Sequence, residues 1–142
     1  MTANHFTWPV RVYWEDTDAG GIVYYANYLK FMERARTEWL RALGVEQSVL
    51  QRDHGLIFVV VDTQVDFKKP ARYDDALIVT ARIRERTRAT FSFVQEVLRG
   101  DELLVTGALR AACLDAKSYR PCGLPKILTE KLAMKKPNTG RT

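Results

Sequence analysis

One helical pattern in the first third of the chain constrains the fold more than any other feature of the sequence. Apolar residues recur there at steps of three or four, and the pattern is formed by Tyr28, Met32, Ala35, Trp39 and Leu43, widened by Leu29, Phe31 and Leu40. This spacing predicts an amphipathic helix over residues 26–43. We expect Asn27 to cap its start and Gly44 to adopt the left-handed conformation after its end. Only a short helical segment, over residues 46–51, is expected between this helix and the C-terminal tail.

Stretches of alternating apolar and polar residues predict the strands that bury this helix. A first strand is expected over residues 8–14, and four later series follow the helix. Their apolar members are Val59, Val61, Val65 and Phe67; Leu77, Val79, Ala81 and Ile83; Phe91, Phe93 and Val97; and Leu103, Val105, Leu109, Ala111 and Cys113. The connections are short, which favours antiparallel neighbours. The chain is therefore predicted to be an α+β protein with one long helix against a curved antiparallel sheet.

A second set of apolar residues is expected on the sheet face that points away from the helix. If the alternation holds, this set is Ile78, Val94, Leu98, Leu104 and Leu114. Several apolar side chains on one sheet face favour a partner, and pairing between identical chains is the simplest form of such contact. We therefore expect a homo-oligomer.

The length and the charge distribution limit the class of protein. A chain of 142 residues suits one domain, and its longest apolar run, residues 56–61, is far short of the roughly 20 residues that cross a bilayer. The N-terminus lacks the pattern of a secretory signal, so we expect a soluble cytoplasmic protein. Residues 1–116 hold 15 basic and 16 acidic residues, whereas residues 117–142 hold seven basic and one acidic. This balance does not favour nucleic-acid binding by the folded body.

The same change in charge suggests how the chain is divided. We expect residues 1–116 to form the folded domain and residues 117–142 to form a basic C-terminal extension. Its apolar residues predict a short helix near 127–134, followed by a frayed end over the last eight residues.

Metal and triad chemistry are not indicated by the cysteine and histidine residues. Cys113 and Cys122 give neither a disulfide framework nor a metal-binding spacing, and Cys113 is expected to be a small buried apolar residue. His5 lies near a terminus, and His54 is expected in a loop facing solvent, so a Ser–His–Asp triad is disfavoured. We expect no metal and no cofactor, and in an enzyme the acid–base group would be a carboxylate.

Residues 15–28 are the most informative stretch, because they place carboxylates on a glycine-containing turn just before the long helix. The unpaired N–H groups at a helix N-terminus can polarise a carbonyl oxygen, while a nearby carboxylate attacks the carbonyl carbon or activates water. The same pattern also fits a purely structural turn whose acidic residues complement the helix dipole. The residues alone leave both interpretations open.

The order Asp16, Asp18, Gly21, Val23 and Tyr28, followed by residues 31–36 (FMERAR), resembles the motif of hot-dog-fold acyl-CoA thioesterases of the 4-hydroxybenzoyl-CoA thioesterase type. Within that family it most resembles the branch associated with the Tol–Pal cell-envelope system. Residues 67–75 are similar to the family's loop between its second and third strands. The resemblance implies a hot-dog fold, hydrolysis of an acyl-CoA to a carboxylate and free CoA, and dimers that often pair into tetramers, with the groove at the dimer interface.

The resemblance also implies roles for individual residues of the motif. Asp18 matches the family's catalytic carboxylate, acting as nucleophile or general base, and the backbone N–H of Tyr25 matches the oxyanion donor. Gly21 would let the thioester approach the turn, and Asp16 is expected to be structural. Many relatives in this branch carry His where this chain has Tyr25, a change that keeps the backbone donor but removes any role of an imidazole.

Binding of an acyl-CoA would need further residues, of which Arg88 lies where similar enzymes place a basic residue that contacts CoA. Cations are expected near the phosphates of CoA, and Val59 and Val60 are expected to line the acyl pocket unless they serve only the core. The candidate cations are Lys68, Lys69, Arg86 and Arg88, which otherwise are solvated loop charges. Two other functions remain: a hydratase or dehydratase, which would need an active-site His, and a non-catalytic acyl-CoA-binding or scaffold protein of the cell-envelope machinery.

Overall fold

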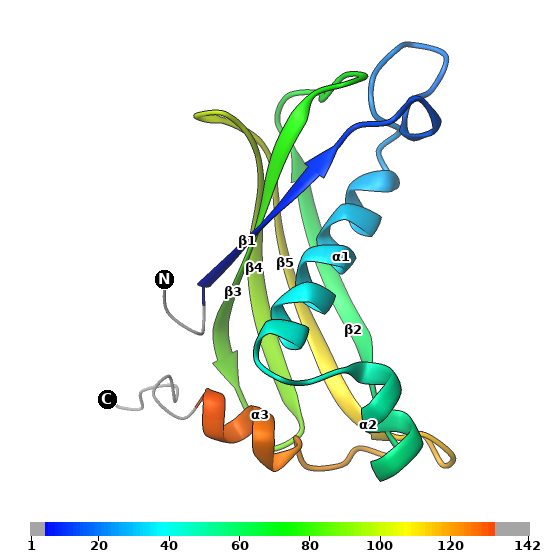
Figure 1. The fold of residues 1–142 in the computed structure, drawn as a ribbon, viewed down its shortest axis with the longest axis vertical. Helices are drawn as coiled ribbons and strands as arrows, with labels where there is room; N and C mark the ends of the chain where they lie inside the picture. Colours follow the sequence, from blue (N-terminus) through cyan, green and yellow to red (C-terminus); the bar gives the residue numbers. More distant parts are fainter. Residues whose placement is uncertain (1–4, 133–142) are drawn as a thin grey trace.

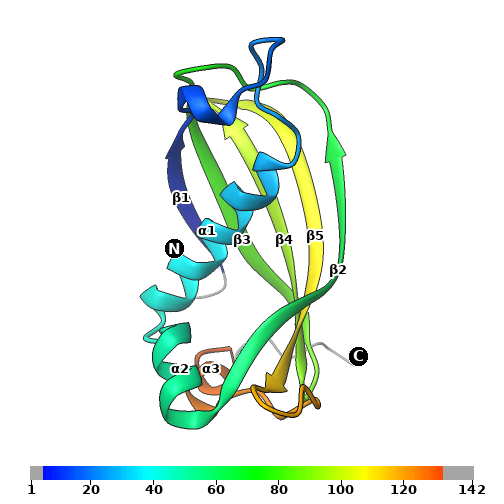
Figure 2. The same ribbon diagram turned by 90° about the vertical axis from the view of Figure 1, so that its right-hand side faces the viewer.

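A sheet of five antiparallel strands wraps around one long helix in the computed structural model, which describes residues 5–132 (Figures 1 and 2). The elements in chain order are β1 (His5–Arg11), a 3-10 turn η1 (Trp14–Asp16), α1 (Asn27–Ala42), α2 (Gln47–His54), β2 (Leu56–Phe67), β3 (Ala76–Arg86), β4 (Thr90–Arg99), β5 (Glu102–Asp115) and α3 (Lys126–Lys131). The strand order is β1-β3-β4-β5-β2, so β1 and β2 form the two edges of the sheet. The expected α+β architecture is confirmed.

Helix α1 buries one apolar face against the inner face of the sheet. Its buried residues are Tyr28, Phe31, Met32, Ala35, Trp39 and Leu40. The helix passes so close to β5 that a Cβ atom on Gly107 would lie 2.9 Å from the Sδ of Met32. A glycine at this point of β5 therefore allows the close packing of helix and sheet.

The ends of the helices differ in part from the expectations. Gly44 has a φ of +91°, as expected after α1, but Asn27 is the first helical residue and not the cap. Its side-chain Nδ2 instead donates a hydrogen bond to the backbone oxygen of Asp16 at 2.9 Å. Leu29 is 44% exposed and does not widen the apolar face. His54 is exposed but ends helix α2, so the expected loop is wrong there.

Three strand predictions fail for identifiable reasons. Strand β1 ends at Arg11, and Trp14 lies in the 3-10 turn with 75% of its surface exposed. The pairing of β2 with β5 shifts register between Val60 and Asp62, which is a β-bulge. The bulge interrupts the alternation that predicts Val61 on the same face as Val59 and Val65, and Val61 is exposed. In the pairing of β4 with β5, Val97 faces Val105 but Leu98 faces Leu103, so Leu104 is an extra residue between them. Leu104 is buried in the core and does not belong to the outer face.

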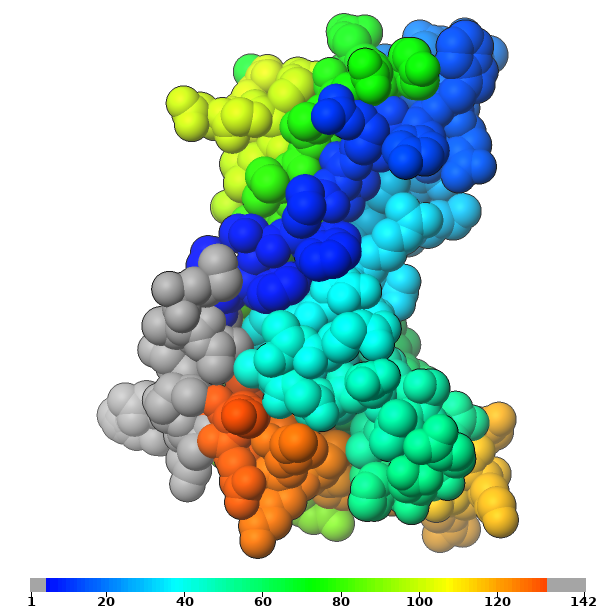
Figure 3. All heavy atoms as spheres, viewed as in Figure 1, coloured from blue at the N-terminus to red at the C-terminus, as the bar shows by residue number. Residues whose placement is uncertain are grey.

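The segment after residue 116 packs against the main core. Leu124, Leu128 and Leu132 are buried in the same cluster as Trp39 and Phe91. Figure 3 shows α3 lying against the bottom of the molecule beside α1 and α2. The division at residue 116 remains a prediction, and the expected frayed end lies outside the described residues.

Candidate active site

Asp18 lies at the tip of a short hairpin that leads into α1. The backbone N–H of Asp18 donates to Ile22 O at 3.0 Å, and the N–H of Gly21 donates to Asp18 O at 3.0 Å. Gly21 adopts a φ of +81°, a conformation that glycine accepts without strain. The carboxylate of Asp18 is exposed, and its Oδ1 accepts a hydrogen bond from the N–H of Gly20 at 2.8 Å. The turn therefore presents a carboxylate whose orientation is fixed by its own backbone.

Asp16 holds the base of this hairpin. Its Oδ2 accepts a hydrogen bond from the N–H of Tyr13 at 2.8 Å, and its backbone oxygen accepts one from the N–H of Tyr24 at 2.9 Å. The same oxygen binds the side chain of Asn27. These contacts give Asp16 the structural role expected for it.

Tyr25 carries a free backbone donor just before α1. The N–H groups of Tyr24 and Asn27 donate to backbone oxygens, whereas those of Tyr25 and Ala26 between them have no acceptor within residues 5–132. Such a donor lies at the positive end of the helix dipole. The ring of Tyr25 is 60% exposed and packs edge-on against Phe67, with 6.0 Å between the ring centroids.

An apolar groove of about 270 Å³ adjoins Tyr25. Its walls include Tyr25, Tyr28, Phe67, Lys68 and Lys69. The structure therefore brings Tyr25 together with the two candidate lysines. Phe67 and Tyr28 were not predicted as site residues, although both belong to the segments that carry the family resemblance.

The two lysines of the groove differ in their contacts. The Nζ of Lys69 forms an ion pair with Glu102 at 3.2 Å, and Lys68 is exposed to solvent. The hydrogen bonds from Arg99 and Lys69 lower the pKa of Glu102. Lys69 is thus held in place by a carboxylate that stays ionised.

Val59 and Val60 lie apart from this groove. They line a second hollow of about 150 Å³ between α1 and β2, together with Phe58 and Arg36. Arg36 was not predicted; its Nη1 donates to the Oε1 of Gln95 at 2.9 Å, and burial lowers its pKa to about 10. The place of Arg36 in this hollow depends on contacts between α1 and the sheet, which the sequence alone does not reveal.

Arg86 and Arg88 lie at the opposite end of the sheet from Asp18. Strand β3 starts at Ala76, which pairs with Arg11 next to the motif, and ends at Arg86, roughly 33 Å away at about 3.3 Å per residue (Figure 1). The Nε of Arg86 is buried and has no hydrogen-bond partner among the described residues. One chain alone therefore does not bring these arginines to the groove beside Tyr25.

Within the described residues the structure shows neither a metal-binding cluster nor a membrane-spanning helix. No group of three or more His, Cys, Asp or Glu side chains within residues 5–132 is arranged to hold a metal ion. No helix in that same part of the chain has the length and apolar character required to cross a bilayer.

The long helix wrapped by a five-stranded antiparallel sheet, with a carboxylate turn at the helix start, defines a hot-dog-fold protein of the thioesterase class. The family model that matches residues 12–132 describes the thioesterase-like superfamily. The chain belongs to this superfamily, as the motif at residues 16–28 predicts.

Known proteins similar to this chain agree with that assignment. It is 44% identical to the acyl-CoA thioesterase YbgC of Haemophilus influenzae, over 89% of this chain and 93% of that protein. It is 40% identical to the acyl-CoA thioester hydrolase YbgC of Escherichia coli, over 90% of this chain and 96% of that protein. A crystal structure of a probable thioesterase from Bartonella henselae superimposes with a TM-score of 0.81 at 36% identity, covering 85% of this chain and 99% of that one.

Proposed function

We propose that this protein hydrolyses the thioester of an acyl-CoA to a free carboxylate and CoA. The proposal rests on the N–H of Tyr25, a residue that lines an apolar groove and whose N–H has no acceptor within residues 5–132. Tyr25 directly follows the hairpin that carries the exposed carboxylate of Asp18. The relatives that are 44% and 40% identical and are named acyl-CoA thioesterases support the same reaction.

In this proposal the N–H of Tyr25 binds the carbonyl oxygen as negative charge develops on it. Asp18 then acts in one of two ways. Its carboxylate attacks the carbonyl carbon, CoA leaves as the thiolate, and water hydrolyses the resulting anhydride; or it removes a proton from a water molecule that attacks directly. The thiolate is a good leaving group, so neither route requires a strong general acid. Losing an oxyanion donor of this kind typically costs about 2.7–4 kcal/mol of transition-state stabilisation.

The substitution Asp18→Asn tests the carboxylate. Turnover is expected to fall by at least about a hundredfold, because the amide can neither attack nor take a proton at neutral pH. The fold is expected to persist, since the Oδ1 of Asn can still accept the hydrogen bond from Gly20. The measurement is thiol release from a panel of acyl-CoA substrates, with circular dichroism as the folding control; wild-type turnover in this variant would refute the role of Asp18.

Two further measurements separate the open alternatives. A single turnover in ¹⁸O-water labels the carboxylate of Asp18 only if that carboxylate is the nucleophile. Measurable binding of acyl-CoA without thiol release from any member of the panel would favour the non-catalytic binding or scaffold protein instead. The panel also defines the acyl-chain preference.

We further propose that the working molecule is a homo-oligomer and that a second chain completes the site. Strand β2 is an edge of the sheet, and Val60 and Val61 on it are 49% and 46% exposed. Arg86 and Arg88 lie at the other end of the sheet from the groove beside Tyr25, so they do not bind CoA there within one chain. A second copy that pairs along β2 would bring its own arginines toward that groove, where they bind the phosphates.

Mixing two impaired variants tests whether the site is shared. Asp18→Asn and Arg88→Gln are each expected to be impaired, whereas co-expressed dimers regain about a quarter of wild-type turnover, because a mixed dimer contains one intact shared site. If Asp18 and Arg88 acted within one chain, the mixture would not exceed the average of the two variants. The assembly itself is measured by sedimentation.

We also propose that the protein is cytoplasmic, because its proposed substrates, CoA thioesters, occur in the cytoplasm. Cell fractionation with an antibody checks it. Association with the Tol–Pal machinery remains a prediction from the resemblance.

A further inference from the structure

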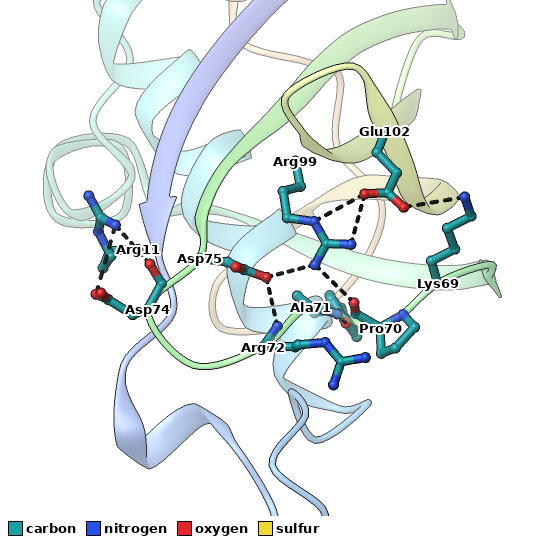
Figure 4. A network of polar contacts seen from close by, with 10 residues as sticks. Arg11, Lys69, Pro70, Ala71, Arg72, Asp74, Asp75, Arg99 and Glu102 are labelled. Atoms are coloured by element: carbon teal, nitrogen blue, oxygen red, sulfur yellow. Dashed lines mark hydrogen bonds and ion pairs between the residues drawn. The ribbon is translucent and has the colours of Figure 1, made fainter.

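A single arginine at the end of β4 fastens the loop of residues 68–75, which connects β2 to β3 (Figure 4). The guanidinium of Arg99 donates to the Oδ2 of Asp75 at 2.7 Å and to the backbone oxygen of Pro70 at 3.2 Å. It also donates twice to the Oε1 of Glu102, from Nη2 at 2.8 Å and from Nε at 3.1 Å. Arg99 thus holds two points of the loop and anchors them to the start of β5.

The same loop holds the motif on its other side. The backbone oxygen of Ala71 accepts a hydrogen bond from the N–H of Val23 at 2.9 Å. The N–H of Ala71 donates to the phenol oxygen of Tyr28 at 3.0 Å, and Ala71 is fully buried. Ile22 and Arg72 form a further antiparallel bridge. Ala71 therefore links the hairpin that carries Asp18 to the first turn of α1.

Asp75 ties the two sides of the loop together. Its Oδ2, which binds Arg99, also accepts a hydrogen bond from the N–H of Arg72 at 2.8 Å. The side chains of Asp75 and Arg99 are only 22% and 29% exposed. The contact is consequently better shielded from solvent than the ion pair between Arg110 and Asp62, whose side chains are 50% and 61% exposed.

We propose that Arg99 is a positioning residue for the thioesterase site: by fixing Pro70 and Asp75 it holds Ala71, and through Ala71 it sets the Asp18 hairpin and the start of α1 relative to each other. The inference rests on the proposed function. Arg99 acts at a distance from the reacting atoms, so its loss misplaces the carboxylate and the N–H donor. Because small displacements of reacting groups cost rate, the effect falls on turnover more than on substrate binding.

The test compares Arg99→Gln with the control Arg110→Gln, which removes a more exposed arginine–aspartate ion pair on the same sheet. Arg99→Gln is expected to lower kcat at least tenfold with KM changed less than threefold, and to accelerate amide hydrogen exchange at Val23 and Ala71 at least tenfold. Arg110→Gln is expected to change none of these. Arg99→Lys is expected to remain impaired, because one ammonium cannot reproduce the forked contacts to three residues.

A double variant separates positioning from general destabilisation. If Arg99 works through Asp75, then Asp75→Asn combined with Arg99→Gln lowers kcat no further than Arg99→Gln alone. Unchanged exchange at Val23 and Ala71, or fast exchange with unchanged kcat, would overturn the inference. If the wild-type protein releases no thiol, the proposed function fails, and the exchange rates alone then decide whether Arg99 holds the hairpin.

Discussion

At Tyr25 the backbone and the side chain serve different purposes. The N–H has no acceptor among residues 5–132, while the ring packs against Tyr24 and Phe67 beside the groove. The resemblance predicts His at this position in many relatives. An exchange of the side chain alone therefore tests which part of the residue the reaction uses.

We expect Tyr25→Phe to retain turnover within about threefold, because the substitution keeps both the amide and the ring. Tyr25→His is expected to make turnover depend on pH with a midpoint of about 6.5, the ordinary pKa of an imidazole. Complete pH–rate profiles of the three proteins check this. A tenfold loss in Tyr25→Phe would instead assign a role to the phenol hydroxyl.

The two cysteines are expected to differ in reactivity, because burial raises the pKa of Cys113 to about 11, with a smaller contribution from Cys122. At pH 8 a disulfide reagent is expected to modify Cys122 in the folded protein and Cys113 only after unfolding, since the thiolate is the reactive form. Mass spectrometry of the labelled protein checks the assignment. Rapid labelling of both thiols without denaturant would contradict it.

Among the secondary-structure elements, α3 shows that the fold extends beyond the neutral part of the sequence. Leu128 is fully buried in the main core, whereas its neighbour Ile127 is 43% exposed. Its charge sets this segment apart from residues 1–116, and its buried leucines pack in the same core cluster as Trp39 and Phe91.

Leu128→Ala is expected to lower the free energy of unfolding by about 2–5 kcal/mol, the usual cost of removing a buried leucine side chain. Ile127→Ala is the matched control and is expected to cost less than about 1 kcal/mol. Urea unfolding of both variants measures the difference. Equal small losses would mean that α3 contributes little to the stability of the domain.

The sequence predicts the elements well where periodicity alone decides them, as in α1 and β3. It fails where one residue breaks the period: the bulge at Val61 and the register shift before Leu104 depend on contacts with neighbouring strands. In the candidate site, Asp18, Gly21 and Tyr25 are predicted from the resemblance of residues 16–28 to the family motif, and their roles stay predictions. Phe67 and Arg99 were not predicted, because their contacts join segments that are distant in the chain.

At the scale of the whole molecule, stability is expected to fall in acid through the network around Arg99. Burial alone would raise the pKa of Asp75, but the hydrogen bonds from the N–H of Arg72 and from Arg99 outweigh it and lower the pKa. The pKa of Glu102 is lowered as well. Both carboxylates therefore bind protons more readily in the unfolded chain.

The contribution of these two residues is complete above their ordinary pKa values of about 4 and is lost as the pH falls toward the lower values of the folded state. Between pH 5 and pH 3 the wild-type protein is expected to lose more stability than the double variant Asp75→Asn with Glu102→Gln. Urea unfolding at both pH values checks this. Identical losses in the two proteins would show that the network does not titrate as described.

The three tryptophans lie in three different surroundings. Trp39 is 1% exposed, Trp8 is half-buried, and Trp14 is 75% exposed and packs edge-on against Tyr73, with 5.1 Å between the centroids. Tyr73 belongs to the loop that Arg99 fastens. Acrylamide is therefore expected to quench the fluorescence of Trp14 first. A change in that quenching when an acyl-CoA is added would report movement of the loop without any label. The fluorescence of Trp39 would report unfolding of the core.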